Sequence, residues 1–108
     1  MTIALGGWDI KKFDEVEWVP WGSGGDARAK VMSSGDGYYL SLVEAAEGYR
    51  GDPHVHAHTE FLFVVDGSLR NQGKAMARHD AYVAAIGSSH DDFEVGPGGA
   101  TYLSIFKL

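Results

Sequence analysis

The sequence predicts an all-β protein, and three observations support that prediction. Glycine makes up 15 of the 108 residues, about twice its ordinary share, and is spread along the chain where tight turns need it. Short segments rich in strand-forming residues recur at spacings of about 8–12 residues, which is typical of a β-sandwich or β-barrel. Helical periodicity is nearly absent. We therefore expect one domain over residues 1–108 with a β-sheet core.

Residues 1–26 are predicted to form an N-terminal arm and an edge strand. The one candidate for helix lies in residues 9–18, where a short apolar pattern favours a helical turn running into a strand. A strand over residues 16–21 should lie at a sheet edge, because Pro20 cannot donate a hydrogen bond to a ladder.

The remaining strands are expected between glycine-rich turns. They are predicted over residues 27–32, 38–45, 54–58, 61–65, 68–72, 74–77, 81–86, 93–95 and 101–108. Asp66-Gly67 has the composition of a two-residue hairpin turn between two of them. Residues 96–99, Gly-Pro-Gly-Gly, predict the last turn.

The segment over residues 61–65, Phe-Leu-Phe-Val-Val, is apolar on both faces of its predicted strand. A small barrel covers only one face of each strand, so the other face needs a second cover. Two covers are equally compatible with the sequence. One is a second subunit, and the other is the N-terminal segment that carries Trp8, Phe13 and Trp18.

Three of the five histidines alternate with other residues in one predicted strand, namely His54, His56 and His58. Side chains at i and i+2 share a face, with Cα atoms about 6.6 Å apart, so two imidazoles can reach one ion at about 2.1 Å. The outer pair is about 13 Å apart on a straight strand. The spacing therefore leaves open His54 with His56 or His56 with His58 as the chelating pair.

Glu60 places a carboxylate at the start of the most apolar segment, where an unpaired charge would be costly to bury. On an unbroken strand it would lie about 20 Å beyond His54. It can share an ion with the histidines only if the chain bends near residues 57–59.

Residues 48–67 carry the spacing G-x5-H-x-H-x3-E-x6-G, set by Gly48, His54, His56, Glu60 and Gly67. This spacing resembles the first motif of the cupin superfamily at every defined position. Residues 79–94 resemble the second cupin motif in part. Gly87 and His90 match it, whereas His79, Ala85 and Glu94 depart from it.

The resemblance implies a double-stranded β-helix, a jelly-roll barrel with a metal ion inside its mouth. It implies the ligands His54, His56, Glu60 and His90, with Glu60 also the candidate catalytic residue, and it leaves His58 and His79 as non-ligands. Three imidazoles and one carboxylate suit a divalent transition metal: Fe, Mn, Ni, Co, Cu or Zn. An octahedral ion would keep two open positions, which suits catalysis or reversible binding rather than a closed structural site.

The lead-in over residues 15–21, Glu-Val-Glu-Trp-Val-Pro-Trp, resembles small cupins akin to the sensor cupin of anti-sigma factors and to diketone-cleaving dioxygenases. That resemblance implies a metal-dependent dioxygenase, an oxidoreductase acting on a small enolisable or phenolic oxygenated molecule. One alternative is a non-catalytic cupin that senses or binds a small molecule or metal. Another is a metal-dependent lyase or isomerase, with Tyr38, Tyr39, Tyr82 and Tyr102 as candidate acids or bases.

Composition excludes several other classes. The chain has no cysteine, so it has no disulfide and no thiolate nucleophile. Its net charge of −6 and lack of a basic run argue against a nucleic-acid partner, and no apolar stretch approaches the roughly 18 residues of a membrane span. The N-terminus shows no export signal, which predicts a cytoplasmic protein.

We expect a homodimer, formed by strand exchange or sheet packing near the N-terminal strands.

Overall fold

The computed structural model describes residues 6–51, 54–90 and 92–107, with only the backbone for His90. Its regular structure is almost entirely β, as predicted. In chain order, the described elements are the 3-10 turn η1 (Phe13–Glu15) and the strands β1 (Val19–Pro20), β2 (Ala27–Gly35), β3 (Tyr38–Ala45), β4 (His54–Val55), β5 (Glu60–Asn71), β6 (Lys74–Ala77), β7 (Ala81–Ala84), β8 (Ser89–His90) and β9 (Glu94–Lys107).

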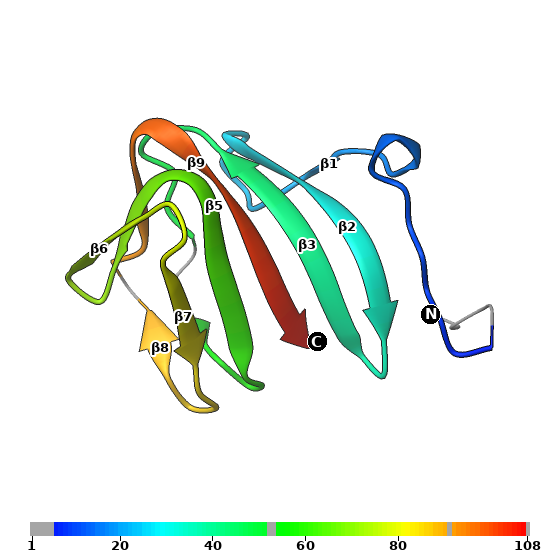
Figure 1. Ribbon diagram of the computed structural model, residues 1–108. Coiled ribbons are helices and arrows are strands. Elements are labelled where there is room, and N and C mark those ends of the chain that lie inside the picture. The colour runs from blue at the N-terminus through cyan, green and yellow to red at the C-terminus, as the bar shows by residue number, and fades with distance from the viewer. Residues whose placement is uncertain (1–5, 52–53, 91, 108) are drawn as a thin grey trace.

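The strands form one large antiparallel sheet and one small one (Figure 1). The large sheet has the order β1-β2-β3-β9-β5-β6, and β7 pairs with β5. The small sheet pairs β4 with β8. These two sheets bring together the two segments that carry the predicted motifs.

The core lies on one face of the central strands β3, β9 and β5. Tyr102 of β9 pairs with Val43 of β3 on one side and with Val64 of β5 on the other. All three side chains are buried, at 0% to 4% exposure. Alternation along each strand then directs the next residues outward, as expected for a sheet with one covered face.

The predicted hairpin at Asp66-Gly67 is wrong, and the predicted turn at residues 96–99 is a stretch inside β9 that has no register partner in the ladders with β3 and β5. β5 continues from Glu60 to Asn71 and β9 from Glu94 to Lys107, and the turn after β5 lies at Gln72-Gly73. Register shifts interrupt the β5–β9 ladder next to Gly67. The glycines therefore form bulges that bend two long strands rather than turns that end short ones.

Gly67 is where β5 and β9 approach most closely. Its φ is +79°, in the left-handed region that favours glycine. A Cβ there would overlap the carbonyl oxygen of Gly99 and lie 2.8 Å from the Cα of Ala100. Both strands can bend together only because this position has no side chain.

The N-terminal arm packs on β2 rather than on β5 (Figure 1). Lys30 of β2 is 5% exposed, donates a hydrogen bond to the Phe13 carbonyl at 2.6 Å, and lies over the rings of Phe13 and Trp18. The predicted helical turn is η1, and the predicted edge strand is the two-residue β1. The arm therefore does not cover the segment over residues 61–65, and that alternative is wrong.

The outward face of the large sheet keeps an exposed apolar row across four strands. Phe61 of β5 pairs with Val83 of β7 and with Ile105 of β9, and Ile105 also pairs with Leu40 of β3. Phe61, Val83 and Ile105 are 50%, 58% and 39% exposed. Phe63, two residues along β5 on the same face, is 40% exposed. We call these side chains the outer apolar row.

Within the described part of the chain, the structure contains no helix with the length and apolar character needed to cross a membrane.

Replacing Gly67 should test the bend. We expect Gly67→Ala to lower the free energy of unfolding by roughly 3 kcal/mol or more, since it adds a backbone overlap to the cost of a left-handed alanine. Gly25→Ala is the matched control, with a φ of +73° and open space around the added methyl, and should cost only about 1–2 kcal/mol. Urea unfolding of both variants gives the comparison, and equal losses would contradict the close-approach argument.

Candidate functional site

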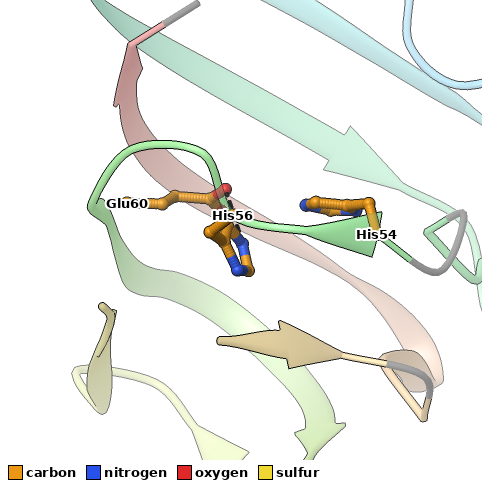
Figure 2. Close-up of side chains that lie close together, drawn as sticks. All are labelled: His54, His56 and Glu60. Carbon is orange, nitrogen blue, oxygen red and sulfur yellow. Dashed lines mark ion pairs between the residues drawn. The ribbon is translucent and has the colours of Figure 1, made fainter. Parts of the chain in front are cut away.

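Three side chains from the first motif come together at one end of the barrel (Figure 2). His54 lies in β4, His56 follows it, and Glu60 begins β5. Between them the chain bends at Ala57 and His58, as the sequence requires if Glu60 is to approach the histidines. The bend turns Glu60 back toward His56 (Figure 2).

The donor atoms of this group have the spacing of ligands around one ion. Each residue offers one donor atom, and the three donor atoms of His54, His56 and Glu60 all lie within 4.8 Å of one another. His56 Nε2 is 3.3 Å from Glu60 Oε1, and the two imidazole centroids are 4.6 Å apart. Neighbouring ligands at about 2.1 Å from a metal ion are about 3.0–3.5 Å apart. The His56–Glu60 separation matches that range.

The His56 ring is oriented by Ser88, which directly precedes β8. His56 is 5% exposed, and its Nδ1 lies 3.0 Å from the carbonyl oxygen of Ser88 and 3.2 Å from the Ser88 hydroxyl. A carbonyl can only accept, so this hydrogen bond needs the proton on Nδ1. It therefore directs the Nε2 lone pair toward Glu60, and backbone orientation of the second ring nitrogen is the usual arrangement for a metal-ligating histidine.

This arrangement fits a divalent cation. The Nε2 lone pair and the Glu60 carboxylate are both electron donors, and they face each other at 3.3 Å. Such a pair is stabilised by a positive charge shared between the two atoms. The donor set of nitrogen and oxygen matches the predicted class of transition metals rather than the all-oxygen shells of Mg²⁺ or Ca²⁺.

The second motif contributes through β8. The backbone of His90 pairs directly with that of His54 in the small sheet. The His90 side chain lies outside the described residues, so its predicted role as a ligand stays a prediction.

The other two histidines are not part of the group. His58 lies on the bend and is partly buried, and His79 packs its ring on Phe63 with centroids 6.0 Å apart. Phe63 belongs to the outer apolar row, so His79 is on the opposite side of the sheet from the core. Among the described residues, neither histidine is brought into the group of His54, His56 and Glu60.

A cavity of about 170 Å³ opens beside the group, inside the barrel. Its polar lining comes from His54, Glu60 and Ser104. Most of its wall is aromatic and is formed by Trp21, Tyr49, Tyr82, Phe93, Tyr102 and Phe106. The cavity therefore combines a mostly apolar wall with a few polar groups, the usual composition of a small-molecule site.

Two tyrosines of the cavity wall, Tyr82 and Tyr102, are poor candidates for a base. Burial, and then the charge of Glu60, raises the pKa of Tyr82 above its ordinary value. Burial is also the main cause that raises the pKa of Tyr102. Both phenols therefore stay protonated near neutral pH, so neither can accept a proton as a phenolate base.

Sequence reasoning missed Ser88 and the aromatic wall. The sequence assigns no role to Ser88, yet its carbonyl oxygen lies 3.0 Å from His56 Nδ1, 32 positions away in the chain. The sequence predicts Trp21 and Phe106 only as strand residues. In the structure their ring centroids are 5.8 Å apart, and both side chains line the cavity. No local pattern marks these residues, because strand pairing brings them to the site.

Comparison with known proteins agrees with this architecture. The sequence matches a family model described as the ChrR cupin-like domain over residues 9–105. No curated protein sequence matches it significantly.

Solved structures with the same fold share little sequence with this chain. One belongs to the complex of Rhodobacter sphaeroides SigE with the anti-sigma ChrR, with 20% identity, a TM-score of 0.76, and coverage of 89% of this chain and 52% of that chain. This chain thus spans about half the length of that protein. An RmlC-like cupin from Shewanella frigidimarina gives 19% identity, a TM-score of 0.77, and coverage of 91% and 88%.

An acetylacetone dioxygenase from Acinetobacter johnsonii gives 13% identity and a TM-score of 0.77. The alignment covers 99% of this chain and 78% of that chain. At such identities the likeness shows the fold alone, and it confirms the predicted cupin double-stranded β-helix.

Proposed function

This chain belongs to the ChrR cupin-like domain family, and we propose that it is a metal-dependent dioxygenase of a small enolisable or phenolic oxygenated molecule. The observation that carries the proposal is the convergence of His54, His56 and Glu60 at the end of an aromatic cavity. A group of donors that opens onto a small-molecule cavity suits chemistry on a bound ligand better than a structural role.

The metal ligands in this proposal are His54, His56, Glu60 and His90. The pairing of His90 with His54 across β4 and β8 supports the fourth ligand, because paired residues on neighbouring strands are close together. When bound there, a redox-active divalent ion would polarise an enolate and support reaction with O2. Glu60 supplies the negative charge that holds the cation, and Ser88 fixes the His56 ring.

The cavity supports a small, largely apolar substrate with oxygen atoms at one end. The acetylacetone dioxygenase neighbour acts on a molecule of that description. The aromatic wall would exclude water from the reacting end, which strengthens electrostatic interactions there.

A sensing function is the second candidate. It is favoured by the match to the ChrR cupin-like family and by the ChrR neighbour, which is an anti-sigma protein in complex with SigE. In that case the same cavity and metal group would bind a ligand without turnover. The two candidates differ in whether O2 and ligand are consumed.

The partner of the outer apolar row, in this proposal, is a second copy of this chain. The row carries no charged side chain. Two copies can therefore meet there without placing acidic side chains opposite one another, although each chain has a net charge of −6. It continues toward the arm, since Asp9, Leu40 and Ile105 line one hollow and the neighbouring Trp8 and Ile10 are 68% and 62% exposed. Contiguous exposed apolar side chains of this kind favour a protein–protein contact.

The ligand set predicts a selective loss of metal binding. Glu60→Gln keeps the side-chain shape and removes the charge, so we expect it to weaken binding of a divalent ion by about 100-fold. His56→Ala should have at least that effect, whereas His58→Ala should leave affinity within about twofold. Elemental analysis after dialysis against graded free metal measures all three. An equal loss in His58→Ala would contradict the assignment.

Turnover separates the two candidate functions. We expect protein loaded with Fe(II) to consume one O2 for each molecule of acetylacetone, with both atoms of ¹⁸O2 appearing in the products. Glu60→Gln should slow this at least tenfold at matched metal content. If protein loaded with Fe, Mn, Ni, Co, Cu or Zn binds a diketone, catechol or hydroxyketone tightly but consumes none, the sensing function replaces the enzyme.

The dimer predicts a mass of twice 11.7 kDa in light scattering at micromolar concentration. Phe61→Glu puts a charge into the outer apolar row and should shift the equilibrium toward monomer by at least tenfold. Val19→Glu is the control, since Val19 is 42% exposed and lies on β1. A monomeric wild type would overturn the dimer.

A further inference from the structure

Tyr82, whose phenol hydroxyl is buried, lines the cavity together with Glu60. Tyr82 of β7 pairs with Leu62 of β5, and both side chains line the cavity. Tyr82 Oη is buried and has no hydrogen-bond partner among the described residues. A buried hydroxyl without a partner costs free energy, so such a group in a ligand cavity points to a ligand atom that completes it.

The strand ladder that includes Tyr82 also carries two serines. Leu62 pairs with Ser104 of β9, and Ser104 pairs with Ser41 of β3. Ser104 is 5% exposed and Ser41 is fully buried, and Ser41 Oγ also has no partner among the described residues. Ser104 lines the cavity, and Ser41 lies buried beside it in the ladder.

The size of the cavity limits the ligand. A cavity of about 150 Å³ accommodates benzene, and this one measures about 170 Å³. A molecule of about six to eight non-hydrogen atoms therefore fills this cavity. Flat aromatic walls, including Phe93 and Phe106, favour a planar molecule.

We propose that Tyr82 is the specificity-determining residue of this cavity. Its hydroxyl donates a hydrogen bond to one oxygen of a planar ligand of about six to eight non-hydrogen atoms, and a second oxygen of that ligand lies at the group of His54, His56 and Glu60. The position of the second oxygen rests on the proposed metal centre. The ligand class is therefore the small 1,3-dicarbonyl compounds and dihydroxy aromatics, and larger diketones are excluded.

The experiment compares the Co(II)-loaded wild type with Tyr82→Phe and with Tyr38→Phe. Tyr38 is 45% exposed and does not line the cavity, so its variant removes a hydroxyl elsewhere. Two probes are titrated while the visible absorption of Co(II) is followed. Acetylacetone has seven non-hydrogen atoms and two oxygens, and azide reaches the metal alone. Metal content is measured after each titration.

We expect Tyr82→Phe to weaken acetylacetone binding about tenfold, the value of one lost hydrogen bond to an ionised oxygen. Azide affinity should stay within twofold, and Tyr38→Phe should change neither. An unchanged acetylacetone affinity in Tyr82→Phe would overturn the proposal. An equal loss of azide affinity would also overturn it, because that result indicates a general structural effect at the metal centre.

The size limit has its own test in the same samples. Benzoylacetone, with twelve non-hydrogen atoms, should bind the wild type at least tenfold more weakly than acetylacetone, and equal affinity would overturn the limit. Failure of acetylacetone to bind the wild type also overturns the proposal. Azide binding in that sample shows that the metal centre itself is intact, and absence of O2 uptake alongside normal binding counts only against the dioxygenase.

Discussion

The antiparallel pairing of β5 with β9 is the constraint on which the other features depend. β9 also pairs with β3, so it joins both halves of the large sheet. The close backbone approach at Gly67 lets β5 bend while it stays paired. As a result, one end of β5 delivers Glu60 to the histidines, and the other end pairs Leu69 with Val95 at the start of β9. The cavity occupies the space that this curvature encloses.

The sequence predicted the parts of the site that depend on short spacing. His54, His56 and Glu60 lie within seven positions, and simple strand geometry required the bend that the structure has at Ala57 and His58. The hairpin at Asp66-Gly67 failed for a physical reason. A glycine with positive φ serves a tight turn and a bulge equally well, and here Gly99, far along the chain, decides between them. Ser88 and Tyr82 reach the site through long-range pairing, which no local pattern encodes.

The two candidate functions, enzyme and sensor, place the same requirement on the ligand. Both need a ligand that is small enough for the cavity and oxygenated enough to meet Glu60 and the buried hydroxyls. The structure satisfies that requirement with a rigid aromatic wall and a histidine whose ring is fixed by a backbone carbonyl. What separates the two functions is the reactivity of the ion and not the shape of the barrel, so one framework can serve either.

The edge strand β1 has a consequence for the behaviour of the protein in concentrated solution. An open sheet edge is a template on which strands of other molecules can add, and this is a route to fibrils. The edge strand β1 is only Val19–Pro20, it pairs with two residues of β2, and its proline has no N–H with which to bind an added strand. The arm next to it is held by Lys30 against β2. Addition of another strand at β1 is therefore disfavoured, which removes one route to open-ended aggregation.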